Sequence, residues 1–158
     1  MEAIHTAATL TDVLIRLTLA AALGAIVGIN RELQRKPAGL RTHALVALGG
    51  ALMTILALSL PGADAATASA AVSRVFQGIV AGIGFIGGGV IMYRGDAKGV
   101  HGLTTAAAIW VVAASGMAVG GGMWRTGLAA SILTLIVLAA GEYVDGWLHR
   151  RSNPTDPN

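Results

Sequence analysis

Five long apolar segments separated by short loops constrain this chain more than any other feature of its sequence. A helix needs about 20 mainly apolar residues to cross the hydrocarbon core of a bilayer. Charged residues make up 12% of the chain, whereas soluble domains carry about 25%. The sequence therefore predicts an all-α integral membrane protein with five transmembrane helices, forming one domain over residues 1–150, and a disordered tail over 151–158. The predicted helices cover residues 11–29, 42–60, 72–93, 104–119 and 124–148.

A four-residue motif occurs twice, 63 residues apart, each time at the start of an apolar segment. The second segment begins within Gly39-Leu40-Arg41-Thr42, and the fourth begins within Gly102-Leu103-Thr104-Thr105. At the same spacing, Gly24 corresponds to Gly87. The repeated unit is an apolar segment, a basic loop and a second apolar segment. This pattern predicts two parallel helix-loop-helix repeats, related by an axis along the membrane normal and followed by a fifth helix.

Lysine and arginine gather in the loops that five crossings place on one side of the membrane. The loop 30–41 contains four of these residues and the loop 94–101 contains two, whereas the opposite loops 61–73 and 120–123 contain none. Short loops rich in lysine and arginine stay in the cytoplasm. We therefore expect the N-terminus outside and the C-terminus in the cytoplasm. The net charge of +3 then follows from topology, and no nucleic acid partner is expected.

Glycine recurs at four-residue spacing within the apolar segments, and small residues at this spacing let helix backbones approach closely in a membrane. The run from Gly82 to Gly87 also matches the GxGxxG dinucleotide pattern, but no strand precedes it, which argues against a nucleotide site. Alternatively, Gly87-Gly88-Gly89 could unwind the third helix and expose its carbonyl groups to a cavity. The glycines predicted to pack helices are Gly24, Gly28, Gly78, Gly82, Gly84, Gly87 and Gly88.

The repeated motif also predicts two anion-friendly helix starts. Thr42 and Thr105 each follow a glycine closely, which places them at expected helix N-caps. The free N–H groups of such a helix start attract a phosphate, a lipid headgroup or an acidic partner segment, although capping alone also explains the threonines. The candidates for anion or partner binding are Arg16, Arg31, Arg35, Arg41, Thr42, His43, Arg74, Thr104 and Thr105.

Two groups of charged residues have both a structural and a functional interpretation. Arg16 lies well inside the first apolar segment, as functional ionisable residues do, but Asp12 stands four residues earlier and would pair with it. Glu142, Asp145 and His149 share one face of the last helix. They are weak candidates for a magnesium contact, and a solvated helix end explains them without a metal.

The sequence shows no catalytic or cofactor-binding pattern. It contains no nucleophile–base pair and no P-loop, and the lack of cysteine excludes disulfides and thiolate metal sites. No Asp or Glu lies in the middle of an apolar segment, where a cation pathway would place one. We therefore expect a protein that is not an enzyme and that needs no cofactor.

Three segments, 35–46, 74–87 and 102–110, resemble in the same order the signature motifs of the MgtC/SapB family. The chain resembles a short member that has the transmembrane domain and lacks the C-terminal cytoplasmic domain of MgtC. It departs from the family where Asn30 replaces a usual acidic residue, and where Ala71 and Val72 stand in place of another.

The resemblance implies a protein of the bacterial inner membrane that adapts cells to low magnesium or related stress, and in pathogens to survival inside host cells. Our first hypothesis is a non-enzymatic protein that acts through contacts with other membrane proteins. The alternative is a small oligomeric channel or transporter for an ion or a phosphate-bearing solute. Membrane lipid and further copies of the chain are the other expected partners, because the small-residue faces exceed what five helices need.

Overall fold

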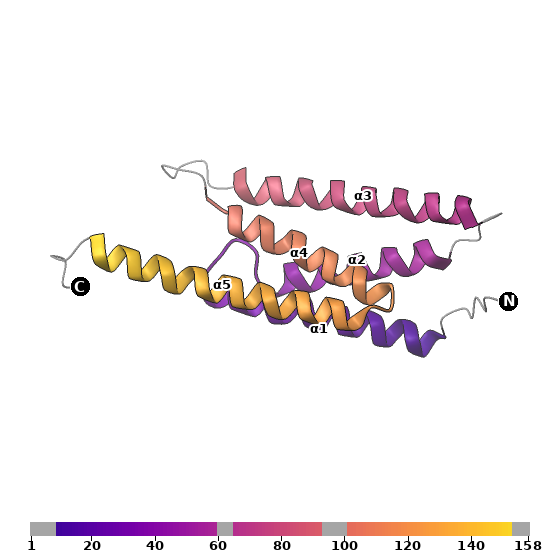
Figure 1. Cartoon of the computed structure of the whole chain (residues 1–158), viewed down its shortest axis with the longest axis horizontal. Coiled ribbons are helices and arrows are strands. Elements are labelled where there is room, and N and C mark those ends of the chain that lie inside the picture. Colours follow the sequence, from indigo (N-terminus) through magenta and orange to yellow (C-terminus); the bar gives the residue numbers. More distant parts are fainter. Residues whose placement is uncertain (1–8, 60–64, 93–100, 153–158) are drawn as a thin grey trace.

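The computed structural model describes residues 9–59, 65–92 and 101–152, without the side chains of 65, 66, 68 and 145–152. Every regular element in this part of the chain is an α-helix (Figure 1). All five helices are long and apolar enough to cross a membrane, which confirms the predicted fold class. The helices are α1 (Leu10–Leu33), α2 (Leu40–Ser59), α3 (Ala65–Met92), α4 (Leu103–Gly120) and α5 (Trp124–Ser152).

Three helices extend well beyond the apolar segments that predicted them. Helix α1 continues to Leu33 rather than ending at residue 29. Helix α3 begins at Ala65 rather than at 72, because the alanine-rich stretch before residue 72 favours a helix without being strongly hydrophobic. Helix α5 continues to Ser152, so the first two residues of the predicted tail are helical. The rest of that tail lies outside the described residues, as does the loop 94–101 apart from His101.

Two glycines of α1 allow close packing between α1 and α2. A Cβ atom at Gly24 would overlap the carbonyl oxygen of His43, and one at Gly28 would lie 2.6 Å from the Cα of Leu40. The backbones of α1 and α2 therefore approach more closely than any side chain larger than hydrogen allows, as expected for helices that pack in a membrane.

The α3–α4 hairpin makes contact at the corresponding positions, but less tightly. A Cβ atom at Gly87 would lie 3.4 Å from the Cβ of Ala106, and these two residues correspond to Gly24 and His43 at the spacing of 63. Between the hairpins, α2 and α4 run parallel. A Cβ atom at Gly50 would lie 2.7 Å from the carbonyl oxygen of Ala113, its own counterpart. The two predicted repeats are thus related by an approximate two-fold axis along the bundle.

The core lies around α2 and α4, and α3 is the least covered helix. Half of the apolar window of α4 is buried, against 6% for α3. Helix α3 packs only on α4 and α2 among the described helices and runs along one edge of the bundle (Figure 1). It is helical throughout Gly87-Gly88-Gly89, so the alternative of an unwound segment there is wrong.

The predicted packing glycines therefore fall into two groups. Gly24, Gly28 and Gly87 face another helix of the same chain. The other four lie on α3, where an added Cβ atom would meet nothing within 4 Å in the described chain; they are Gly78, Gly82, Gly84 and Gly88. Packing through these four positions stays a prediction about a partner.

Candidate anion pocket at the basic end of the bundle

Arg31 lies inside the protein, although the sequence predicted it in a basic loop. It stands in the last turn of α1 and is 2% exposed. It continues the buried face formed by Gly24, Val27 and Gly28, because positions three, four and seven residues apart share one side of a helix. Arg31 is therefore buried because it lies on the face of α1 that packs against the rest of the bundle.

The guanidinium group of Arg31 has fewer partners than donors. Nη2 donates to the hydroxyl of Thr105 at 3.0 Å, and Nη1 donates to Oε1 of Gln34 at 3.3 Å. Nε is buried and has no partner. The nearest carboxylate in the described chain is that of Glu142, 3.8 Å from Nη1 and itself 42% exposed. Since a guanidinium carries five N–H donors, Arg31 keeps both charge and donors available.

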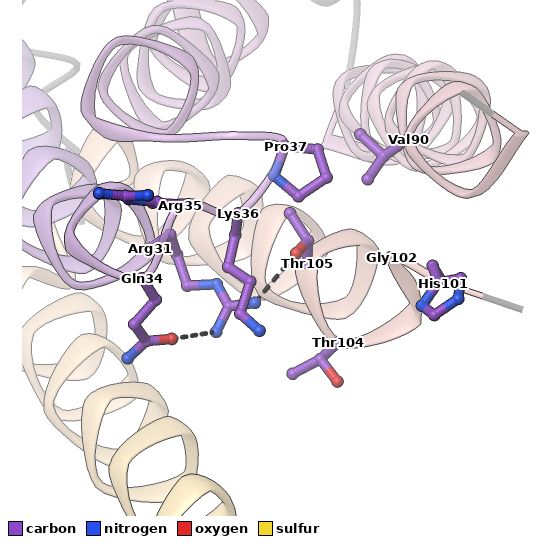
Figure 2. Close-up of a pocket in the computed structure, with 10 residues that line it drawn as sticks. All are labelled: Arg31, Gln34, Arg35, Lys36, Pro37, Val90, His101, Gly102, Thr104 and Thr105. Atoms are coloured by element: carbon purple, nitrogen blue, oxygen red, sulfur yellow. Dashed lines mark hydrogen bonds between the residues drawn. The ribbon is translucent and has the colours of Figure 1, made fainter. Parts of the chain in front are cut away.

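A cavity of about 320 Å³ opens beside this side chain, between the end of α1 with its following loop and the start of α4. Figure 2 shows Lys36 extending along the same side as the Arg31 guanidinium, whereas Arg35 extends away from it. Of the predicted candidates, the structure brings together Arg31, Arg35, Thr104 and Thr105. The lining residues are Arg31, Gln34, Arg35, Lys36, Pro37, Val90, His101, Gly102, Thr104 and Thr105.

The two motif threonines are not N-caps, contrary to the sequence prediction. Helix α2 begins at Leu40 and α4 at Leu103, so Thr42 and Thr105 both lie in the first turn. The N-cap of α4 is Gly102, which has φ 87° and no side chain to cap the helix. Glycine adopts this left-handed conformation without strain, which lets the N-cap lie at Gly102, three residues before the expected N-cap Thr105. The hydroxyl of Thr105 is instead the acceptor for Arg31.

The two helix starts differ in what satisfies their free N–H groups. At α2, Oε2 of Glu32 accepts from the N–H of Leu40 at 2.8 Å, so the chain supplies its own carboxylate. At the spacing of 63, the counterpart of Glu32 is Gly95, which has no such group. The N–H groups of the first turn of α4 have no acceptor within their helix, and they lie beside the Arg31 cavity.

Comparison with known proteins now identifies the kind of protein to which this bundle belongs. Residues 17–147 match the family model described as the MgtC family. The chain belongs to the MgtC family. The matched region contains most of the first repeat, the whole second repeat and every residue that lines the cavity, and the family suggested by the sequence motifs is confirmed.

Several curated relatives of this MgtC family protein are 39–42% identical to it. Protein SrpB of Synechococcus elongatus is 42% identical over 130 residues, which cover 78% of this chain and 71% of SrpB. YhiD of Escherichia coli, named a putative magnesium transporter, is 42% identical over 136 residues, or 80% of this chain and 59% of YhiD.

Protein MgtC of Salmonella typhimurium is 39% identical over 122 residues, or 77% of this chain and 49% of MgtC. The chain thus spans about half of the length of MgtC and about three fifths of that of YhiD. No solved structure matches.

Arg16 lies at the opposite end of the bundle of this MgtC family protein. Its Nη2 is 2.7 Å from Oδ2 of Asp12, and its Nη1 donates to the carbonyl oxygen of Gly120 at 3.0 Å. Its charge is therefore balanced by a carboxylate of the same helix, and its hydrogen bond to Gly120 connects α1 to the end of α4. The pairing with Asp12 that the sequence suggested is confirmed.

The remaining candidates stand apart from the cavity. Arg41 and Arg74 are exposed and make no ion pair within the described chain. His43 is buried, with Nδ1 2.9 Å from the carbonyl oxygen of Gly39. Thr42 is half-buried in the first turn of α2. None of the four lines the space beside Arg31.

Of the three weak metal candidates near the end of α5, only Glu142 has a described side chain. Glu142 is directed to Arg31, while the side chains of Asp145 and His149 lie outside the described residues. No group of three or more metal-binding side chains occurs among the residues that are described.

Proposed function

We propose that this protein is a non-enzymatic regulator in the bacterial inner membrane, with its C-terminus in the cytoplasm. It would adapt the cell to low magnesium or related stress through contacts with other membrane proteins. Membership of the MgtC family and the magnesium-related name of YhiD support the physiological setting. The observation that carries the mode of action is the uncovered face of α3.

That face has the character of a helix-docking surface. Gly78 and Gly82 are one turn apart, and added Cβ atoms at both positions would meet nothing within 4 Å. Only 6% of the apolar window of α3 is buried by the chain. In lipid, helices associate through close backbone packing at small residues, since apolar side chains alone gain little by leaving lipid. The partner we propose is therefore a transmembrane helix of another protein. A second copy of the chain is the other occupant that the face would accept.

The alternative is a channel or transporter for an ion or a phosphate-bearing solute, and the described acidic side chains argue against its cation-conducting form. Asp12 pairs with Arg16, Glu32 caps the start of α2, and Glu142 lies beside Arg31. Asp12 and Glu32 each have a structural partner near an end of α1, and Glu142 stands near the end of the apolar span of α5. A cation pathway would be expected to place an ionisable group near the middle of the membrane.

Because the chain has no cysteine, site-specific crosslinking tests the proposed surface directly. We would introduce Gly82→Cys on α3 and, as a control, Leu133→Cys, which is 61% exposed on α5. A thiol-directed crosslinker would be applied to inner membranes from cells grown in low and in high magnesium. We expect a defined adduct with another membrane protein from Gly82→Cys, stronger in low magnesium and absent from the control.

A second variant makes this result decisive. Gly78→Leu places a large side chain one turn away on the same face and should abolish the adduct while leaving the protein folded. If Gly82→Cys yields only an adduct of twice the chain mass, the face mediates self-association instead. If it yields no adduct, or one that Gly78→Leu does not alter, the docking surface is refuted.

A further inference from the structure

We propose that the cavity beside Arg31 is a binding site for a phosphate-type oxyanion, either free phosphate or the phosphate of a lipid headgroup. The proposal goes beyond partner docking on α3 and does not depend on it. It begins from the side chain of Arg31, which is 2% exposed and whose Nε has no partner. Burying a charge is costly unless it is paired, and the exposed carboxylate of Glu142 at 3.8 Å is a poor counter-ion.

The start of α4 supplies a second, independent source of positive potential. The N-terminus of a helix presents free N–H groups and the positive end of the helix dipole, which together favour an anion. In the first repeat, the carboxylate of Glu32 occupies this place on α2. In the second repeat, glycine stands both at the N-cap, Gly102, and at the counterpart of Glu32. The corresponding position on α4 therefore receives no carboxylate from the equivalent residue.

The remaining lining matches a group with several acceptor oxygens. Lys36 adds an ammonium group, and Thr104 adds a hydroxyl at the edge of the cavity (Figure 2). A tetrahedral phosphate group can accept at the same time from a guanidinium, an ammonium and helix N–H groups, and arginine binds phosphate especially well. A cavity of about 320 Å³ corresponds to the volume of roughly ten water molecules, so a phosphate group fits with part of its solvation.

Glu142 is the internal competitor for this site. Its carboxylate is the anion nearest to Arg31 in the described chain, yet it is half exposed and free to move into solvent. Glu142 does not itself line the cavity, so an entering oxyanion would compete with it for the charge of Arg31. Removing the charge of Glu142 should therefore tighten anion binding, which is a result that a cation site would not give.

The test measures binding of two probes to the purified full chain. In a phosphate-free maltoside detergent, calorimetry would follow titration with inorganic phosphate at constant ionic strength. In the same detergent, native mass spectrometry would compare phosphatidylglycerol with diacylglycerol, which has no phosphate. Saturable binding of inorganic phosphate would identify a free solute as ligand. Binding of phosphatidylglycerol alone would identify a headgroup site.

The variants separate this cavity from the general positive charge of the loop. Lys36→Gln should weaken binding about tenfold, the effect of one charge-assisted hydrogen bond, whereas Arg41→Gln should leave it unchanged. Arg41 belongs to the same basic loop region but does not line the cavity. Arg31→Gln should abolish binding, and Lys36→Gln keeps the test valid if Arg31→Gln does not fold.

Glu142→Gln should strengthen binding. The proposal is overturned if neither probe binds, if Arg41→Gln weakens binding as much as Lys36→Gln, or if Glu142→Gln weakens it.

Discussion

The guanidinium of Arg31 donates a hydrogen bond of 3.0 Å to the hydroxyl of Thr105, 74 residues later in the chain, and both side chains are buried. The bond joins the last turn of α1, in the first repeat, to the first turn of α4, in the second. It also fixes the guanidinium at the wall of the anion cavity. One contact therefore serves both the cohesion of the repeats and the geometry of the candidate site.

Replacing Thr105 with valine should destabilise the protein by about 1–3 kcal/mol, because the change removes an acceptor from a buried charged donor while keeping the side-chain shape. Reversible unfolding in detergent would measure the loss of free energy. The matched control is Thr104→Val. Thr104 is the exposed neighbour and makes no side-chain hydrogen bond in the described chain, so the change should cost less than about 0.5 kcal/mol. Equal losses in both variants would show that the Arg31 contact contributes nothing.

The close packing of α2 on α4 gives a second prediction. A Cβ atom at Gly116 would overlap the carbonyl oxygen of Ala47, and a backbone atom cannot move aside as a flexible side chain can. Gly116→Ala should therefore cost about 1–3 kcal/mol, the usual effect of overpacking, measured by the same unfolding assay. Gly82→Ala on α3 is the control, because its Cβ would meet nothing within 4 Å. A stable Gly116→Ala protein would contradict the observed helix spacing.

The carboxylate of Glu32 gives a third prediction, because it holds the start of α2. Glu32→Ala should destabilise the first turn by about 1 kcal/mol, as removal of a helix-capping group does. Glu32→Gln should cost less, since its amide oxygen can still accept from the N–H of Leu40. Amide hydrogen exchange would follow the effect locally, with faster exchange expected at Leu40 and unchanged exchange in α5. Unaltered exchange at Leu40 in the alanine variant would exclude the capping role.

Hydropathy and periodicity were sufficient to predict the architecture. Five apolar segments of membrane-spanning length admit little besides five helices, and the spacing of 63 residues predicted the relation between the hairpins that Gly50 and Ala113 show. Helix ends were less predictable. Leu103 belongs to α4 because Gly102 turns the chain in the left-handed region, and composition does not reveal a left-handed glycine.

The position of Arg31 was the main feature that sequence reasoning missed. A basic residue near the end of an apolar segment was assigned to the loop, since positive charge anchors such ends in the cytoplasm. The available signal was its spacing of three and seven residues from Gly28 and Gly24, which places it on the packing face. Its partner Thr105 could not be predicted, because a hydrogen bond between repeats depends on how the two hairpins dock.

The final prediction concerns ion flux through the protein and the roles of Arg16 and Arg41, and it distinguishes regulation from transport. Reconstituted into liposomes, the wild-type protein should show no flux of magnesium or phosphate above that of empty liposomes. Arg16→Ala and Arg41→Ala should behave in the same way. Arg16 is occupied by Asp12 and by the carbonyl oxygen of Gly120, so its removal should lower stability rather than alter a pathway. Arg41 is exposed at the start of α2 and lies apart from the cavity.

Circular dichroism of the same liposomes would verify that each variant is folded. A wild-type flux that either substitution abolishes would make that arginine part of a conduction path, and the regulator proposal would then fail even if the α3 surface binds a partner.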